Sequence, residues 1–139
     1  MSLFTDGEIA YLQAQQLGRL ATTGKTGMPH VVPTGFEVDV DKGTIKIGGH
    51  ALKGRGQERL YIRHIAVNPK AAFVVDDLVT EPTWTPSGIT LKGDVVVHAE
   101  GGEALGPGFG PQWIEIIPTW VSSWGVDTSS YEPAVPRKA

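Results

Sequence analysis

A run of alternating side chains from His30 to Val40, followed by a turn and a second short run, constrains the fold of this chain most strongly. Every second residue of the run falls on one face of an extended strand, namely Val32, Thr34, Phe36, Val38 and Val40. Residues 41–43 (Asp-Lys-Gly) are typical of a turn, and residues 44–47 return the chain, which predicts a β-hairpin. Pro33 removes one backbone donor, so its strand is expected at a sheet edge or at a bulge.

The rest of the chain predicts further short strands and two helices. With Gly 18 and Pro 10 among 139 residues, strands joined by turns are favoured over a helix bundle. Further strands are expected at residues 19–23, 71–75, 89–99, 113–117 and 121–126, with Gly93 as a candidate bulge and Pro118 as a bend or stop. Residues 81–88 and 100–111 are expected to be loops.

Two short helices complete the prediction. Thr5 and Glu8 form a capping-box pattern that starts a helix running to about Gln16. A second helix is expected over residues 58–67, because Pro69 moves the residue before it out of the helical region.

These elements predict a mainly β fold with short helices. Six or seven strands that follow one another through tight turns form a mainly antiparallel sheet, and a closed or nearly closed barrel hides its edges most simply. We expect one domain over residues 1–127 and a poorly ordered C-terminal tail over residues 128–139.

Composition excludes several classes of function. The formal net charge of −3 argues against a dedicated nucleic-acid binder, and the absence of cysteine excludes disulfides and thiolate chemistry. The N-terminus lacks a signal-peptide pattern and no apolar stretch is long enough for a bilayer, so a cytoplasmic protein without a membrane partner is expected. The four histidines lack metal-ligand spacing, so no metal site is predicted, and no residue set identifies a catalytic group.

A cluster of positive charge lies between His50 and His64. Its cations are Lys53, Arg55, Arg59 and Arg63, and Gly48, Gly49, Gly54 and Gly56 precede or interleave with them. Glycine lets backbone amides approach an anion closely, and arginine binds phosphate through two parallel hydrogen bonds. Arg59 and Arg63 would share one helix face. The cluster is therefore a candidate phosphate site, with a solvated basic helix face as the alternative.

Four segments in order resemble the pyridoxamine-phosphate-oxidase-like split-barrel family. They read LGRLATTGKTGMPHVVPTGFEVD, IRHIAVNPKAAFVVDDL, GITLKGDVVV and IIPTWVSSWGVD, and the last resembles the closing segment of the actinobacterial deazaflavin (F420) branch. The resemblance covers residues 6–127. It implies a six-stranded antiparallel split β-barrel, a homodimer with two cofactor sites at the subunit interface, and F420 or FMN as cofactor.

The same resemblance indicates which residues hold the cofactor. Residues 32–36 and 47–50 would line its ring, and the basic residues around the following helix would hold its phosphate. The candidate cofactor contacts are Val32, Pro33, Thr34, Gly48, Gly49, His50, Lys53, Arg55, Arg59, Tyr61, Arg63 and Trp120.

Two of these positions depart from the family. Tyr61 stands where a lysine is usual, and Trp120 follows Pro118-Thr119 where an arginine is frequent. Loss of these cations weakens phosphate attraction by about 1–3 kcal/mol, for which Lys53 or Arg55 would compensate.

Three functions follow as hypotheses. The first is an F420-dependent oxidoreductase that transfers a hydride to a small conjugated or aromatic substrate. The second is an FMN-dependent enzyme of the same fold. The third is a non-catalytic protein that binds a cofactor or a tetrapyrrole, which the departures at Tyr61 and Trp120 keep open.

Overall fold

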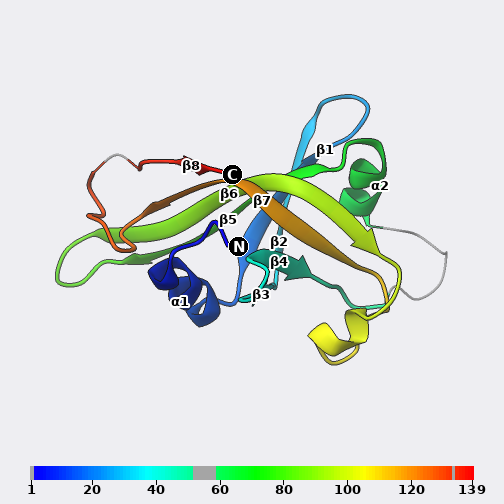
Figure 1. Cartoon of the computed structure of the whole chain (residues 1–139), viewed down its shortest axis with the longest axis horizontal. Coiled ribbons are helices and arrows are strands. Elements are labelled where there is room, and N and C mark those ends of the chain that lie inside the picture. The colour runs from blue at the N-terminus through cyan, green and yellow to red at the C-terminus, as the bar shows by residue number, and fades with distance from the viewer. Residues whose placement is uncertain (1, 52–58, 133) are drawn as a thin grey trace.

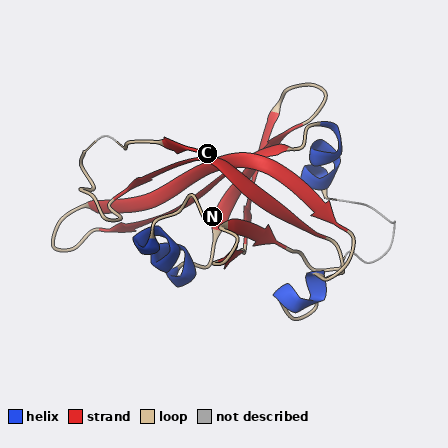
Figure 2. Ribbon diagram, in the orientation of Figure 1, coloured by secondary structure: helices blue, strands red, loops and turns tan. Residues whose placement is uncertain are grey.

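The computed structural model describes residues 2–51, 59–132 and 134–139. Among them, eight strands form one antiparallel sheet in the order β2-β1-β5-β6-β7-β4-β3, with β8 paired to β7 (Figures 1 and 2). The strands are β1 (Gly18–Thr23), β2 (Pro29–Thr34), β3 (Glu37–Asp39), β4 (Thr44–Ile47), β5 (Lys70–Val79), β6 (Thr85–His98), β7 (Trp113–Trp124) and β8 (Arg137–Lys138). The helices are α1 (Asp6–Ala14), α2 (Leu60–Val67) and the 3-10 turn η1 (Gly102–Leu105). The mainly β fold is confirmed, whereas the expected count of six strands is too low.

The sheet curls so that its two edges come near each other. β2 and β3 end the strand order without pairing to one another, and only Gly35 and Phe36 connect them. Three virtual bonds separate the Cα atoms of Thr34 and Glu37, which are therefore at most about 11 Å apart. The result is a barrel that is split along one seam, with β2 at the edge that Pro33 predicts.

The long extended run of the sequence is consequently two strands rather than one. Val32, Thr34, Phe36 and Val38 do alternate toward the more buried face, but Val40 is 49% exposed and lies in the turn after β3. The chain must change direction at Gly35 to move from one sheet edge to the other, and this ends the strand.

The core fills the inside of the curled sheet. Leu20, Phe73, Leu91, Ile114 and Ile116 from five different positions in the sheet are at most 1% exposed. Each such side chain contributes about 1.5–3 kcal/mol by leaving water. The helices add Leu12 from α1 and Tyr61, Ile62 and Ile65 from α2.

Three strands are longer than the sequence predicts. β5 continues to Val79, and β6 already begins at Thr85, inside the expected loop 81–88. The two strands expected at 113–117 and 121–126 are one strand, β7. Long cross-strand ladders hold these extensions, and such pairing is not visible in local sequence.

A bulge lets β7 pass through Pro118. The register shifts between Lys92, which faces Trp120, and Gly93, which faces Pro118, so Thr119 is the extra residue. A Cβ on Gly93 would lie 2.0 Å from the Ile117 carbonyl oxygen, so only glycine fits there. A bulge is present at the predicted level, beside Gly93, but its extra residue belongs to β7 rather than to the strand of Gly93, and Pro118 does not end β7.

The chain ends differ in how well they follow prediction. The Thr5 and Glu8 capping box is present, and α1 ends at Ala14, slightly earlier than expected. In the segment expected to be a poorly ordered tail, residues 137–138 instead form β8 against β7, and Arg137 pairs with the buried carboxylate of Glu8. Within the described ranges, no helix has the length and apolar character needed to cross a membrane.

Candidate functional site

A cavity of about 460 Å³ opens at the seam of the barrel. We call it the seam cavity; its lining residues are His30, Val32, Pro33, Thr34, Gly35, Gly48, Gly49, His50, Arg59, Leu60, Tyr61 and Phe109. They come from β2, the residues that follow β4, the start of α2 and the loop before β7. The seam brings these four segments together because β2 and the β3–β4 pair are the two sheet edges.

One wall of the seam cavity is a face of β2. His30, Val32 and Thr34 alternate on this strand and are partly buried, while their neighbours are exposed. The hydroxyl oxygen of Thr34 is buried and has no hydrogen-bond partner among the described residues. An unsatisfied buried hydroxyl costs about 1–3 kcal/mol. Thr34 therefore places an unsatisfied polar group at this wall, beside the apolar contacts of Val32 and Pro33.

The opposite wall is built around Arg59. Its Nη2 atom donates to the carbonyl oxygen of His50 over 2.7 Å. A Cβ on Gly49 would lie 2.8 Å from the Arg59 guanidinium carbon, so glycine lets this cation pack against the backbone. The guanidinium is thereby held at the cavity surface, where its remaining donors suit an anion.

Phe109 forms the floor between Gly48 and His50. A Cβ on Gly48 would lie 2.8 Å from the Phe109 ring, and the His50 ring meets Phe109 edge-on with centroids 4.9 Å apart. An isolated bridge between His50 and Phe109 joins the two backbones. This contact fixes the otherwise irregular glycine-rich loop at the site.

A smaller cavity of about 230 Å³ lies on the other side of Arg59. It shares Gly49, His50, Arg59 and Tyr61 with the seam cavity and continues to Trp113. Tyr61 is 6% exposed, and burial raises the pKa of its phenol although Arg59 opposes the shift. Tyr61 is therefore neutral at physiological pH and adds no charge to either cavity.

The structure brings eight of the twelve sequence-predicted contacts together around the seam cavity. These are Val32, Pro33, Thr34, Gly48, Gly49, His50, Arg59 and Tyr61. Lys53 and Arg55 lie outside the described residues. Arg63 is exposed on α2 and does not line the seam cavity.

One expectation about the basic cluster needs correction. Arg59 is not helical: it precedes α2 with φ −62° and ψ 149°, so it does not share a helix face with Arg63. Trp120 lies in β7, where the Lys92 ammonium is 4.4 Å from its ring centroid; it does not line the seam cavity of its own chain, and its contact with the cofactor stays a prediction.

Sequence reasoning missed His30, Leu60 and Phe109 as cavity residues, whereas Gly35 lies within the predicted range 32–36. His30 could have been found, because it is two residues before Val32 and therefore on the same strand face. Phe109 carried no signal, since its position depends on the bridge to His50.

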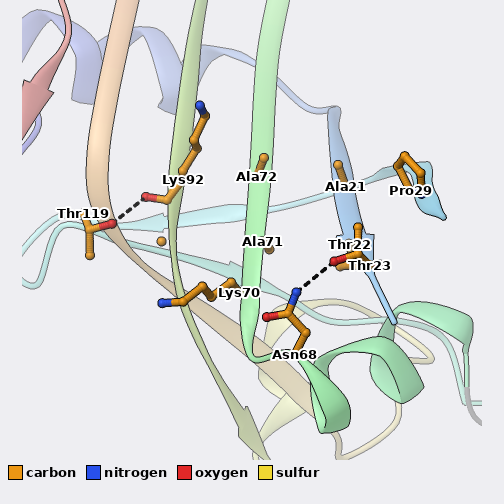
Figure 3. Close-up of a pocket in the computed structure, with 11 residues that line it drawn as sticks. Ala21, Thr22, Thr23, Pro29, Asn68, Lys70, Ala71, Ala72, Lys92 and Thr119 are labelled. Carbon is orange, nitrogen blue, oxygen red and sulfur yellow. Dashed lines mark hydrogen bonds between the residues drawn. The ribbon is translucent and has the colours of Figure 1, made fainter. Parts of the chain in front are cut away.

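The outer face of the sheet carries a separate cavity of about 350 Å³. Figure 3 shows this outer-face cavity, whose lining includes Lys70 and Lys92 and the small side chains of Ala21 and Ala72 on the neighbouring strands β1 and β5. Asn68 donates to the Thr23 hydroxyl over 2.8 Å, and Thr119 donates to the Lys92 carbonyl oxygen over 3.4 Å. The outer-face cavity shares no residue with the seam cavity.

Solved structures with this fold bind different cofactors, according to their descriptions. A haem-binding protein from Mycobacterium smegmatis superposes with a TM-score of 0.67 at 15% identity, over 99% of this chain and 60% of that one. An FAD-binding protein from the same organism gives a TM-score of 0.60 at 20% identity, over 88% of this chain and 96% of that one. At such identities these similarities establish the fold alone.

Sequence comparison is more specific. A 5a,11a-dehydrotetracycline/5a,11a-dehydrooxytetracycline reductase from Streptomyces rimosus is 38% identical over 124 residues, which are 89% of this chain and 84% of that protein. Residues 5–125 match the family described as pyridoxamine 5'-phosphate oxidase. With its split barrel, its seam cavity and this match over most of its length, the chain belongs to the pyridoxamine 5'-phosphate oxidase family.

Proposed function

We propose that this protein is an F420-dependent reductase that transfers a hydride to a small conjugated or aromatic molecule. The observation that carries the proposal is the seam cavity, which joins an unsatisfied Thr34 hydroxyl on one wall to the Arg59 cation on the other. The 38% identity to a reductase of a polycyclic compound supports both the reaction class and the kind of substrate.

The residues of the seam cavity suit a flat ring with an anionic tail. Val32 and Pro33 offer apolar contact, Thr34 adds a polar side chain to the same wall, and Arg59 suits a phosphate. The bound deazaflavin supplies the hydride, so the protein needs to orient the two partners and exclude water rather than provide an acid–base pair. The described lining residues, which contain no acid–base dyad, are consistent with this.

A second candidate is an FMN-dependent oxidoreductase in the same cavity. It is favoured by the fold similarity to FAD-binding proteins and by the neutral Tyr61 beside Arg59, because a cofactor with one phosphate needs few cations. The third hypothesis, a tetrapyrrole carrier, is favoured by the fold similarity to a haem-binding protein.

The proposal includes a homodimer in which the outer face of the sheet meets a second copy. Ala21, Ala72, Lys92 and Trp120 form one cross-strand row on this face, and the row includes two very small side chains. In such a dimer Trp120 would lie against the partner rather than in its own seam cavity. Ala72→Glu is expected to give a monomer by sedimentation velocity, and an unchanged mass would count against this interface.

The deciding experiment is a titration of the purified protein with F420, FMN and haem, followed by quenching of tryptophan fluorescence. Submicromolar binding of F420, with at least tenfold weaker binding of FMN and haem, is the expected result. Tighter binding of FMN would replace the first candidate with the second, and tight binding of haem alone would favour the third.

Turnover is tested with F420 in its reduced form and a fused-ring conjugated ketone. We expect one molecule of reduced F420 to be oxidised for each molecule of product formed. If F420 binds and no member of a panel of conjugated ketones is reduced, the protein is a cofactor carrier and not a reductase.

A further inference from the structure

Two histidines that are far apart in the sequence meet behind the seam cavity. His30 lies on β2 and lines the cavity, and His64 lies on α2 behind it. Their rings meet edge to face, with centroids 5.7 Å apart and an interplanar angle of 85°. The sequence alone gave no reason to associate them, because 34 positions separate them.

His64 is held in place by its surroundings. The buried Thr22 hydroxyl is 3.0 Å from its Nδ1 atom, and Thr22 is 3% exposed. A Cβ on Gly24 would lie 2.6 Å from its Cδ2 atom, so the ring packs directly on the backbone of the β1–β2 turn. His64 therefore positions His30, which is the ring that reaches the cavity.

Few side chains of the seam cavity can carry positive charge. Among its described lining residues these are His30, His50 and Arg59. His50 is exposed and packs against Phe109, whereas His30 is partly buried. Tyr61, which also lines the cavity, is neutral. An anion in this cavity thus has Arg59 on one wall and His30 on the other.

The charged groups around the histidine pair favour an anion as their missing partner. Among the described residues, only His98 has a ring nitrogen within 4.0 Å of a carboxylate, so neither His30 nor His64 has an acidic partner at that distance. Among the described residues, the groups that contact the pair include the Thr22 hydroxyl from β1 and the Gly24 backbone from the turn. From the α2 side, Arg59 and Tyr61 line the same cavity and Arg63 is exposed beside His64.

We infer that His30, positioned by His64, is a proton-dependent contact for the phosphate of the ligand in the seam cavity. Two positively charged imidazolium rings this close repel each other. A phosphate beside His30 offsets that repulsion. Phosphate binding and proton uptake are therefore coupled, and affinity falls as pH rises through the range in which imidazole loses its proton.

This inference rests on the proposed function for the identity of the ligand, but not for the anion site. Inorganic phosphate alone therefore provides the first test. In histidine ring NMR spectra at pH 7, phosphate is expected to shift the signals of His30 and His64 and to leave those of His98 unchanged. If up to 50 mM phosphate moves neither His30 nor His64, the inference is overturned.

The second test separates the phosphate from the ring by comparing FMN with riboflavin. Above pH 6.5 the phosphate monoester of FMN is mostly a dianion. A change in the preference for FMN over riboflavin between pH 6.5 and pH 8.5 therefore reports a change in the charge of the protein rather than of the ligand. The wild type is expected to prefer FMN by roughly tenfold more at pH 6.5 than at pH 8.5, which corresponds to about 1.4 kcal/mol for one charge-assisted hydrogen bond.

Variants identify the group responsible. His30→Gln is expected to remove the pH dependence of the preference for FMN, while the affinity for riboflavin stays within twofold. His64→Gln is expected to reduce that pH dependence only in part. His98→Gln is the matched control, because His98 bonds to Glu115 and does not line the cavity. Circular dichroism checks that each variant is folded.

The outcomes distinguish the two proposals. Equal pH dependence in wild type and His30→Gln, or its loss only in His50→Gln, overturns the histidine assignment and leaves flavin binding intact. If phosphate shifts His30 and His64 but neither F420 nor flavins bind at any pH, the anion site stands and the proposed cofactor is wrong.

Discussion

The Arg59 guanidinium packs against the backbone of Gly49 and donates from Nη2 to the next carbonyl oxygen, that of His50, over 2.7 Å. Arg59, which precedes α2, is thus bonded to the backbone that follows β4. The hydrogen bond orients the guanidinium, and the absence of a side chain at Gly49 leaves space for it. The wall of the seam cavity that would face an anion depends on this hydrogen bond and on this glycine.

Gly49→Ala is expected to weaken binding of phosphate-bearing cofactors without unfolding the protein. The added methyl carbon would lie 2.8 Å from the Arg59 guanidinium carbon, so the guanidinium must move. A lost charge-assisted contact of about 1.5–3 kcal/mol corresponds to roughly 10- to 150-fold in affinity. Fluorescence titration with F420 and FMN measures the change.

Arg59→Ala and the double variant Gly49→Ala/Arg59→Ala provide the control for Gly49→Ala. If the alanine at position 49 acts by displacing Arg59, the double variant binds F420 and FMN no more weakly than Arg59→Ala alone. Additive losses would mean that the Gly49 backbone contacts the ligand by itself.

Glu115 is expected to stabilise the fold in a pH-dependent way. Burial raises the pKa of its carboxyl, but hydrogen bonds from Thr44 and His98, together with the charge of Lys42, outweigh it, so the pKa is lowered below 4.5. Ionised Glu115 thus adds stability that is full above pH 4.5 and is lost as pH falls through the lowered pKa.

The measurement is urea unfolding of Glu115→Gln between pH 7 and pH 3. A loss of about 1–2 kcal/mol in the free energy of unfolding is expected at pH 7, and it should shrink below pH 4.5. Glu103→Gln, at an exposed residue of η1, is the matched control. A constant difference at all pH values would rule out this role.

Arg137→Met is expected to destabilise the fold although residue 137 is near the end of the chain. Arg137 pairs with Glu8, whose side chain is 1% exposed, and also donates to the Leu3 carbonyl oxygen over 3.3 Å. Because Glu8 keeps its capping bond from the Thr5 backbone, we expect a loss of about 1–3 kcal/mol rather than the full cost of an unpaired buried charge.

Thermal unfolding measures this effect, with Lys138→Met in the same strand as control. A melting temperature of Arg137→Met equal to that of the control would show that the Arg137–Glu8 contact contributes nothing measurable to the fold.

Gly93→Ala is expected to be among the most damaging single changes. Its methyl group would meet the Ile117 backbone, which cannot move aside as a flexible side chain could. We expect a loss of about 2–4 kcal/mol in unfolding free energy, or an insoluble protein. Val96→Ala, at a 41% exposed position of the same strand, should change it by less than about 0.5 kcal/mol.

Features that depend on neighbouring residues could be predicted from the sequence. The capping box of Thr5 and Glu8, the turn at residues 41–43 and the bulge beside Gly93 each have a local cause, and the structure contains all three. The family resemblance added the split barrel and the group of residues around Thr34 and Arg59.

Features that depend on pairing across the fold could not be predicted. The continuation of β7 through Pro118 depends on its ladder with β6, and β8 forms only because β7 offers it an edge. The meeting of His30 and His64 depends on the β1–β2 register, which sets Thr22 opposite His30. Phe109 reaches the site through a backbone bridge to His50, and no periodic pattern in the sequence predicts such a bridge.

Gly35 and Phe36, the two residues that connect the edges of the sheet, also decide how wide the site can become. Hydrogen bonds do not hold the two edges together there, so the covalent link between β2 and β3 acts as a fixed-length tether across the opening. Relatives could therefore change the size of the molecule they accept by adding or removing a residue at this link, with the rest of the barrel unaltered. In protein engineering, the length of the link at residues 35–36 is therefore one position at which the seam cavity could be resized.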